Sequence, residues 1–159
     1  MVVDRGMAPT EPAFVIGFAG SELDEDGHGR GFIRIGDFSE TFVVTLNYWP
    51  ATQYTQQWHV SLKRLLAGSP GVGLVTCMVA PESGDSGRAW ILYREDDTVA
   101  IQEKLFVPPN FGPDLDADLQ LLHVPPRNMV SEEGVPVSEW SIGITAIEDF
   151  LHHTGHQSG

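Results

Sequence analysis

Short apolar runs, each about the length of a β-strand, hold most of the hydrophobic residues, and a single longer stretch has a different period. The stretch at about 50–67 places its apolar residues at helical spacing, along one face. These residues are Tyr54, Trp58, Leu62, Leu65 and Leu66. Pro50 suits the first turn of a helix, and Gly68 with Pro70 suits its end. The sequence therefore predicts one long helix within a chain that otherwise forms strands.

Several strand-like runs follow one another through short connections, which predicts a hairpin in the first half and an antiparallel meander after the helix. The runs are 14–18, 32–36, 41–46, 73–79, 89–94, 98–106 and 137–142. Asp37–Glu40 is the expected hairpin connection in the first half, and Glu95–Asp97 is a tight acidic turn in the second. Thr145, followed three residues later by Glu148, predicts a capping box on a short C-terminal helix at about 145–153. The expected class is α+β, with a mainly antiparallel sheet.

Length and composition favour one domain. A chain of 159 residues can bury a core without disulfides or metals. Residues 1–10 and 154–159 are rich in small or polar residues, so we expect a flexible N-terminal arm and a flexible tail around a single domain at 11–153. Within it, 22–29 and 108–126 have the charged, glycine-rich or proline-rich composition of surface loops.

Acidic residues exceed basic ones by a wide margin. The chain has 22 Asp and Glu against 9 Lys and Arg, a net charge of −13, and after Lys104 it carries eight acids and one base, Arg127. Such a field repels nucleic acid and anionic membranes and speeds encounter with a basic protein. An alternative is that the acidity only maintains solubility.

Several further signals bear on location and membrane association. No apolar run approaches the roughly 20 residues of a membrane-spanning helix. Residues 1–12 lack the apolar stretch of a secretory signal, and Cys77 is the one cysteine. A chain that cannot form an internal disulfide fits the reducing cytoplasm.

No motif for catalysis, a metal or a cofactor is complete. Asp114–Asp118 begins like a calcium loop, but Leu119 and Pro125 occupy the positions that need glycine and a bidentate acid. The histidines near the C-terminus, His152, His153 and His156, have no fixed carboxylate partner in view. We expect no metal, no cofactor and no enzymatic activity.

Candidate partner-binding residues are the acids of the two predicted turns and of the late loop. Acids in a tight turn lose little entropy on docking, although they also discourage edge-to-edge aggregation of strands. The candidates are Glu95, Asp96, Asp97, Asp37, Glu40, Asp114, Asp116 and Asp118.

Four motifs occur in an order that resembles immunity proteins of bacterial contact-dependent growth inhibition systems. They are Ile35-Gly36-Asp37-Phe38, the Tyr54 to Trp58 helix, Tyr93-Arg94-Glu95 and Ser138-Glu139-Trp140, within about 31–151. The resemblance implies a cytoplasmic protein that binds a toxin domain and blocks its active site without chemistry of its own. Because many nuclease toxins are basic, it also implies a basic toxin protein domain as partner, with no nucleic acid or membrane bound.

Two other classes remain open from the residues alone. A ligand-binding or adaptor module would need a pocket, for which Trp49, Trp90 and Trp140 are the expected lining. A small hydrolytic enzyme would need Asp37, Glu40, His59 or Cys77 to converge as acid, base or nucleophile.

Overall fold

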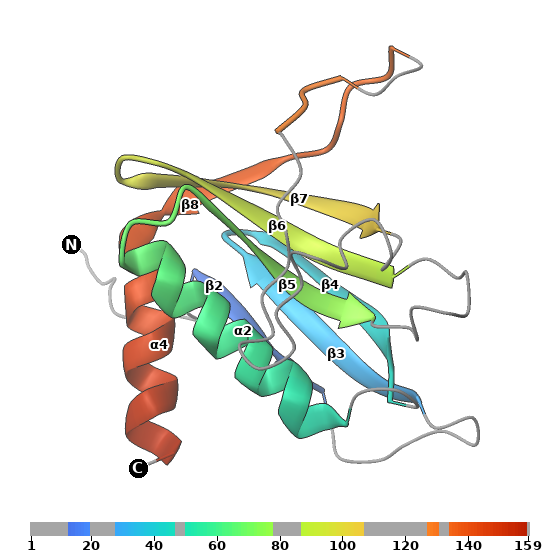
Figure 1. The fold of residues 1–159 in the computed structure, drawn as a ribbon, viewed down its shortest axis with the longest axis vertical. Coiled ribbons are helices and arrows are strands. Elements are labelled where there is room, and N and C mark those ends of the chain that lie inside the picture. Colours follow the sequence, from blue (N-terminus) through green and yellow to red (C-terminus); the bar gives the residue numbers. More distant parts are fainter. Residues whose placement is uncertain are drawn as a thin grey trace, which may run out of the picture.

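The described residues fold into two antiparallel sheets and two helices, seen in Figure 1. The computed structural model describes residues 13–19, 28–46, 50–77, 87–106, 127–130 and 134–158. The strands are β2 (Phe14–Phe18), β3 (His28–Ile35), β4 (Phe38–Thr45), β5 (Gly71–Cys77), β6 (Gly87–Glu95), β7 (Thr98–Phe106) and β8 (Trp140–Gly143). The helices are α2 (Ala51–Leu66) and α4 (Ile144–Ser158). The predicted α+β class with a mainly antiparallel sheet is confirmed.

The first sheet has the order β2-β3-β4, with a tighter hairpin than the sequence suggested. Ile35 pairs with Phe38, so the turn is only Gly36 and Asp37, and Gly36 has φ 61°, where glycine is favoured. The predicted connection Asp37–Glu40 is therefore wrong in length, because Phe38 already begins β4. β3 also begins earlier than predicted, and its first residue, His28, pairs with Thr45.

The second sheet is the predicted antiparallel meander, in the order β5-β6-β7-β8. Glu95 pairs with Thr98 across the β6–β7 turn, and Asp96 takes φ 57°, a left-handed conformation that aspartate tolerates better than most residues. β8 is shorter than the predicted 137–142 strand and starts at Trp140. It pairs with the first part of β7, from Thr98 to Ile101.

Helix α2 lies along β5 and satisfies backbone groups on the free edge of that strand. Gln57 is fully buried; its amide donates to the Gly73 carbonyl at 2.7 Å and accepts from the Val75 N–H at 2.9 Å. The Trp58 indole donates to the Val75 carbonyl at 2.7 Å. An edge strand that would otherwise expose its polar backbone is thereby closed. The predicted helix is confirmed at Ala51–Leu66, with Pro50 as its N-cap.

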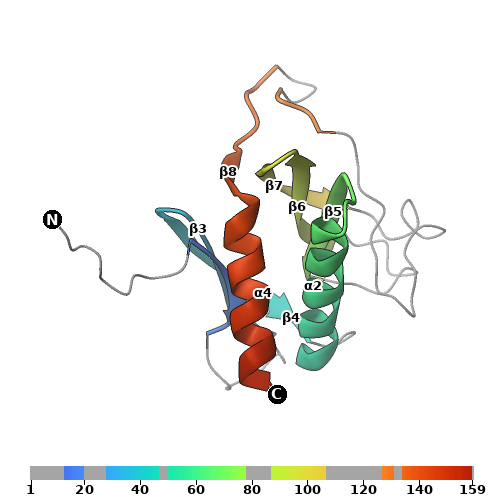
Figure 2. The same ribbon diagram turned by 90° about the vertical axis from the view of Figure 1, so that its left-hand side faces the viewer.

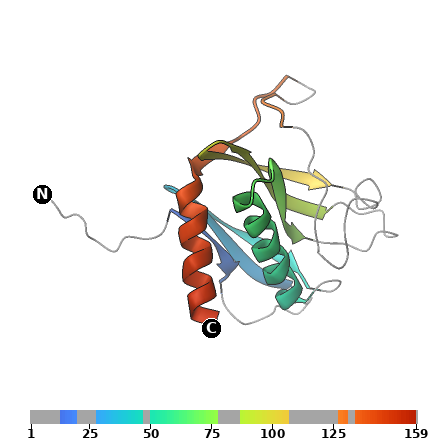
Figure 3. The same ribbon diagram turned by 60° about the vertical axis from the view of Figure 1, so that its left-hand side comes forward.

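Helix α4 differs from the short capped helix that the sequence predicted. It begins at Ile144, directly after β8, so Thr145 lies within its first turn and is not the cap. The Ile144 N–H instead donates to the Asp97 carbonyl at 2.7 Å. The helix continues to Ser158, through most of the segment predicted as a tail. Figures 2 and 3 show α2 and α4 side by side against the sheets.

The inner faces of both sheets and the two helices enclose one core. Its largest fully buried side chains include Trp58, Trp90, Tyr54 and Phe14. Phe38 joins the sheets by stacking on Trp140, with ring centroids 4.3 Å apart, and by an edge contact to Trp90 at 6.5 Å. Within the described part of the chain, no helix is long and apolar enough to cross a membrane.

Candidate partner-binding surface

The β6–β7 turn carries three of the predicted partner-binding acids. Glu95, Asp96 and Asp97 are all exposed, but their backbone is held from both sides. Arg94 donates through Nε to the Asp96 carbonyl at 2.9 Å and through Nη1 to the Leu65 carbonyl at 2.8 Å, at the end of α2. With the bond from the Ile144 N–H to the Asp97 carbonyl, the turn is tied to both helices. Its carboxylates are thus displayed from a rigid support.

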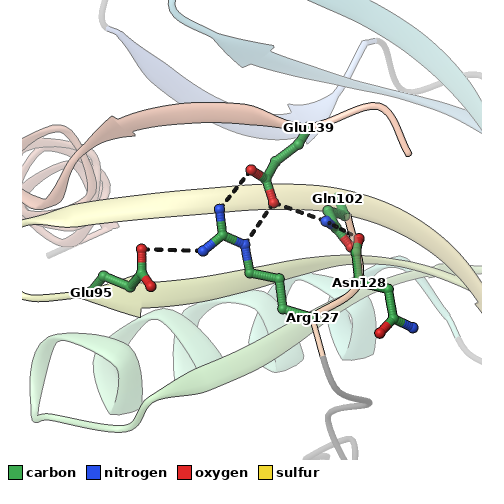
Figure 4. Close-up of polar contacts among 5 residues, drawn as sticks. All are labelled: Glu95, Gln102, Arg127, Asn128 and Glu139. Carbon is green, nitrogen blue, oxygen red and sulfur yellow. Dashed lines mark hydrogen bonds and ion pairs between the residues drawn. The ribbon is translucent and has the colours of Figure 1, made fainter. Parts of the chain in front are cut away.

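An ion-pair network adjoins this turn, and Figure 4 shows its members. Arg127 makes a bidentate pair with Glu139, at 2.8 Å from Nε to Oε2 and 2.7 Å from Nη2 to Oε1. The third guanidinium nitrogen, Nη1, lies 3.1 Å from Glu95 Oε1. Gln102, fully buried on β7, donates through Nε2 to Glu139 Oε2 at 2.8 Å and to the Asn128 carbonyl at 2.9 Å. One arginine therefore joins the acidic turn to the segment that leads into β8.

The network fixes the charge of its members. The hydrogen bond from Arg127 holds the pKa of the Glu139 carboxyl below its usual value, and the bond to Glu139 raises the pKa of Arg127. Burial raises the pKa of the nearby Tyr93 phenol to about 12; the charge of Arg127 opposes this shift and the charge of Glu139 adds to it. At neutral pH the pair is fully ionised while the phenol is neutral.

The three acids of the turn are not equivalent. Glu95 faces Arg127, although its side chain remains 69% exposed. Among the described residues, no cation lies within ion-pair distance of Asp96 or Asp97. These two aspartates are the part of the predicted site whose charge is least offset.

The other predicted acids lie elsewhere. Asp37 is exposed in the β3–β4 turn, whereas Glu40 is half-buried opposite Ile33, on the side of β4 that faces the core. Burial, together with the nearby Glu40 charge, raises the pKa of Glu103. The remaining candidates, Asp114, Asp116 and Asp118, lie outside the described residues. The structure thus places Asp37 and Glu40 on the first sheet and the acidic turn on the second.

The residues considered for catalysis do not form a couple. The His59 ring packs against Phe150, 6.2 Å between centroids, and burial lowers its pKa, followed by the charge of Lys63. The Cys77 sulfur instead lies 3.4 Å from the Thr45 hydroxyl. In the described ranges, no group of three or more His, Cys, Asp or Glu side chains is placed to hold a metal ion.

Trp90 and Trp140, two of the three tryptophans expected to line a ligand pocket, pack against each other instead. Trp90 is fully buried, and its ring meets Trp140 at 5.7 Å, edge to face. Together with Phe38, these rings fill the space between the two sheets. Trp49 lies outside the described residues.

Arg127 is the functional candidate that sequence reasoning missed. Its partners lie 12 residues away, at Glu139, and 32 residues away, at Glu95, so no local spacing connects them. The available signal was its isolation as the one base in a long acidic stretch after Lys104.

Comparison with known proteins gives consistent matches. The sequence model of the CdiI N-terminal domain matches residues 44–150. The "Immunity protein CdiI" of Enterobacter cloacae subsp. cloacae is 27% identical over 128 residues, which cover 76% of this chain and 82% of that protein. A chain of the solved "CdiA-CT/CdiI toxin and immunity complex from Enterobacter cloacae" superposes with a TM-score of 0.75 and 25% identity, over 90% of this chain and 99% of that one.

The family match spans the long helix, the whole β5–β8 sheet and the start of α4. It covers three of the four motifs on which the resemblance rested, together with Arg127 and the acidic turn. The resemblance to immunity proteins of contact-dependent growth inhibition is therefore confirmed, and the chain belongs to the CdiI N-terminal domain family.

Proposed function

We propose that this chain is an immunity protein that binds a CdiA-type toxin domain and neutralises it, without chemistry of its own. The observation that carries the proposal is the near end-to-end likeness to a chain of a toxin and immunity complex, 90% of this protein against 99% of that chain. His59 and Cys77 contact different side chains, Phe150 and Thr45, and the rings of Trp90 and Trp140 pack against each other. Both observations support binding over catalysis.

The expected partner is a basic toxin domain, of the nuclease class. A protein with a net charge of −13 gains association rate from a cationic partner, and a nuclease is cationic where it holds phosphates. Carboxylates that occupy those positions would exclude the nucleic acid substrate. The single cysteine supports action in the cytoplasm, where such a substrate is found.

The proposed contact surface centres on Glu95, Asp96 and Asp97. Because the turn is tied to both helices through Arg94 and Ile144, little conformational entropy is lost when it docks. Asp37 and Glu40, and the late acids Asp114, Asp116 and Asp118, are the secondary candidates. Neutralising the turn should therefore weaken binding more than neutralising the late acids, mainly through faster dissociation.

Growth protection tests the function directly. The neighbouring gene is first sequenced for a CdiA-type toxin domain. That domain is expressed from an inducible promoter, with and without the chain, and the Enterobacter cloacae CdiA-CT domain serves as the comparison toxin. We expect growth to be rescued only for the matching toxin, together with co-purification of the two proteins. Growth arrest that persists while both proteins are abundant and folded would contradict the proposal.

The contact surface is tested with two triple variants. One carries Glu95→Gln, Asp96→Asn and Asp97→Asn, and the matched control neutralises the three late aspartates in the same way. If the control lowers the affinity for the toxin domain more than the turn variant does, the interface lies at the late acids. If neither triple variant changes the affinity, the acidic residues serve solubility and not binding.

A further inference from the structure

A hairpin-like arm precedes β8, the last strand of the second sheet. Its described residues are 127–130 and 134–139, and we call this segment the arm. Val130 pairs with Pro136 in an antiparallel bridge, and the Val137 N–H donates to the Met129 carbonyl at 2.9 Å. Figures 1 and 2 show the arm extending past β7 and β8, at the opposite end of the molecule from the C-terminal end of α4.

Exposed apolar side chains gather on this arm. Met129 is 55% exposed, Val130 51% and Val135 59%. Among the described residues, the only other large apolar side chains this exposed are Val43 and Leu105, one on each sheet. Three such side chains within one short projection are a docking feature, because isolated exposed apolar residues are ordinary but clustered ones mark interaction sites.

The base of the arm is clamped. Arg127 and Glu139, one on each side of it, form the bidentate pair, and Gln102 on β7 bonds both Glu139 and the Asn128 carbonyl. The exposed fractions of the two paired side chains are low, 28% for Arg127 and 14% for Glu139, so water screens the pair only partly. A projection held this way is preorganised for binding.

The clamp also connects the arm to the acidic turn, through the 3.1 Å contact between Arg127 and Glu95. Glu95, at the start of the acidic turn, therefore lies beside the base of the arm.

We propose that the arm supplies the apolar anchor of the interface with the toxin domain, with Met129 and Val130 as its main contacts. The occupant is a basic protein surface that has an apolar recess beside its cationic groups. This inference rests on the proposed function and adds the location of the contact. Charge favours a basic partner over a second copy of this chain, since two copies that each carry −13 repel.

The role of the arm follows from how interfaces gain affinity. Charged groups at a rim govern encounter rate and register, while a few apolar side chains in desolvated pockets govern dissociation. We therefore expect the acidic turn to contribute both to the rate of association and to the lifetime of the complex, and the arm to act mainly by slowing release.

The test compares Met129→Ala/Val130→Ala with a matched control, Val43→Ala/Leu105→Ala, in the full chain. Both remove two apolar side chains of similar exposure, 55% and 51% against 61% and 64%. Binding to the toxin domain encoded beside this chain is measured by surface plasmon resonance. We expect the arm variant to raise Kd at least about tenfold, mostly through faster dissociation, and the control to stay within about twofold of the parent.

An arm variant that binds within about twofold of a binding parent would overturn the arm proposal and leave the immunity function standing. Failure of the parent itself to bind would overturn both. Sedimentation velocity tests the alternative partner, a second copy of this chain. If the parent is a dimer that dissociates in the arm variant but not in the control, the arm mediates self-association and the arm proposal is overturned.

Oxidation of Met129 provides a second readout without mutation. Mild peroxide treatment and mass spectrometry are applied to the free chain and to the chain saturated with the toxin domain. We expect Met129 to oxidise readily when free, because it is 55% exposed, and to be protected several-fold in the complex. Equal oxidation in both states would overturn the assignment.

Discussion

Glu139→Gln should destabilise the protein by about 1 to 3 kcal/mol at pH 7, because net hydrogen bonds to a charged group are worth roughly 1.5 to 3 kcal/mol. The carboxylate accepts two bonds from Arg127 and one from Gln102. An amide keeps one acceptor oxygen, but its NH₂ group must face another donor. At 14% side-chain exposure, little water can replace the lost contacts.

The pH dependence of this difference has a defined sign. The folded-state pKa of Glu139 is depressed below its usual 4.5, so the unfolded chain takes up its proton first as the pH falls. The stabilisation by the carboxylate is fully present above the unfolded pKa and disappears as the pH drops through the folded one. The difference in the free energy of unfolding between the parent and Glu139→Gln should be constant from neutral pH to about pH 5.5 and should shrink at lower pH.

Urea denaturation across pH 3 to 7 is the assay, with Glu95→Gln as the matched control. Glu95 contacts the same arginine but is 69% exposed, so its neutralisation should cost less than about 0.5 kcal/mol. Two results would refute the clamp at the base of the arm. One is a loss of unfolding free energy in Glu139→Gln that does not change with pH; the other is an equal loss in the Glu95→Gln control.

Three further predictions concern the core and the charge. Gln57→Leu should cost about 2 to 5 kcal/mol, because it leaves the buried Gly73 carbonyl and Val75 N–H without partners, while the exposed neighbour substitution Gln56→Leu should cost little; equal thermal stabilities would contradict this. Gly31→Ala should cost more than about 1 kcal/mol, since the added methyl group meets the ring of Phe42, and an unchanged urea midpoint would show that the ring moves aside freely. Association with the toxin domain should slow steeply between about 0.1 M and 1 M salt, as the Debye length falls from roughly 10 to 3 Å, and stopped-flow rates that stay flat would remove electrostatic steering.

The parts of the fold that the sequence predicted well are those set by local periodicity. The stripe from Tyr54 to Leu65 defined α2, because a buried helical face repeats at a fixed spacing. The edges of the strands were less predictable. Gly31 looks like a strand breaker, yet it lies inside β3 because the Phe42 ring occupies the space of a side chain there.

Long-range contacts explain the remaining differences. Ile144 begins α4 because its N–H finds the Asp97 carbonyl, a partner that no local capping pattern reveals. The same holds for the candidate surface: Glu95 was expected as one of three displayed acids, but the fold brings Arg127 to it from 32 residues away. Charge and turn residues could be found from the sequence, whereas the clamp and the arm required the fold.

We propose that this chain neutralises its toxin by binding it through an acidic surface. Calorimetric titration of the purified chain into the toxin domain encoded beside it, at about 0.1 M and 0.5 M salt, tests this claim most directly. We predict a one-to-one complex with nanomolar affinity at the lower salt and a clearly weaker one at the higher salt, with no binding to the Enterobacter cloacae CdiA-CT domain. The absence of any binding to the matching toxin domain, with both proteins folded, would contradict the account.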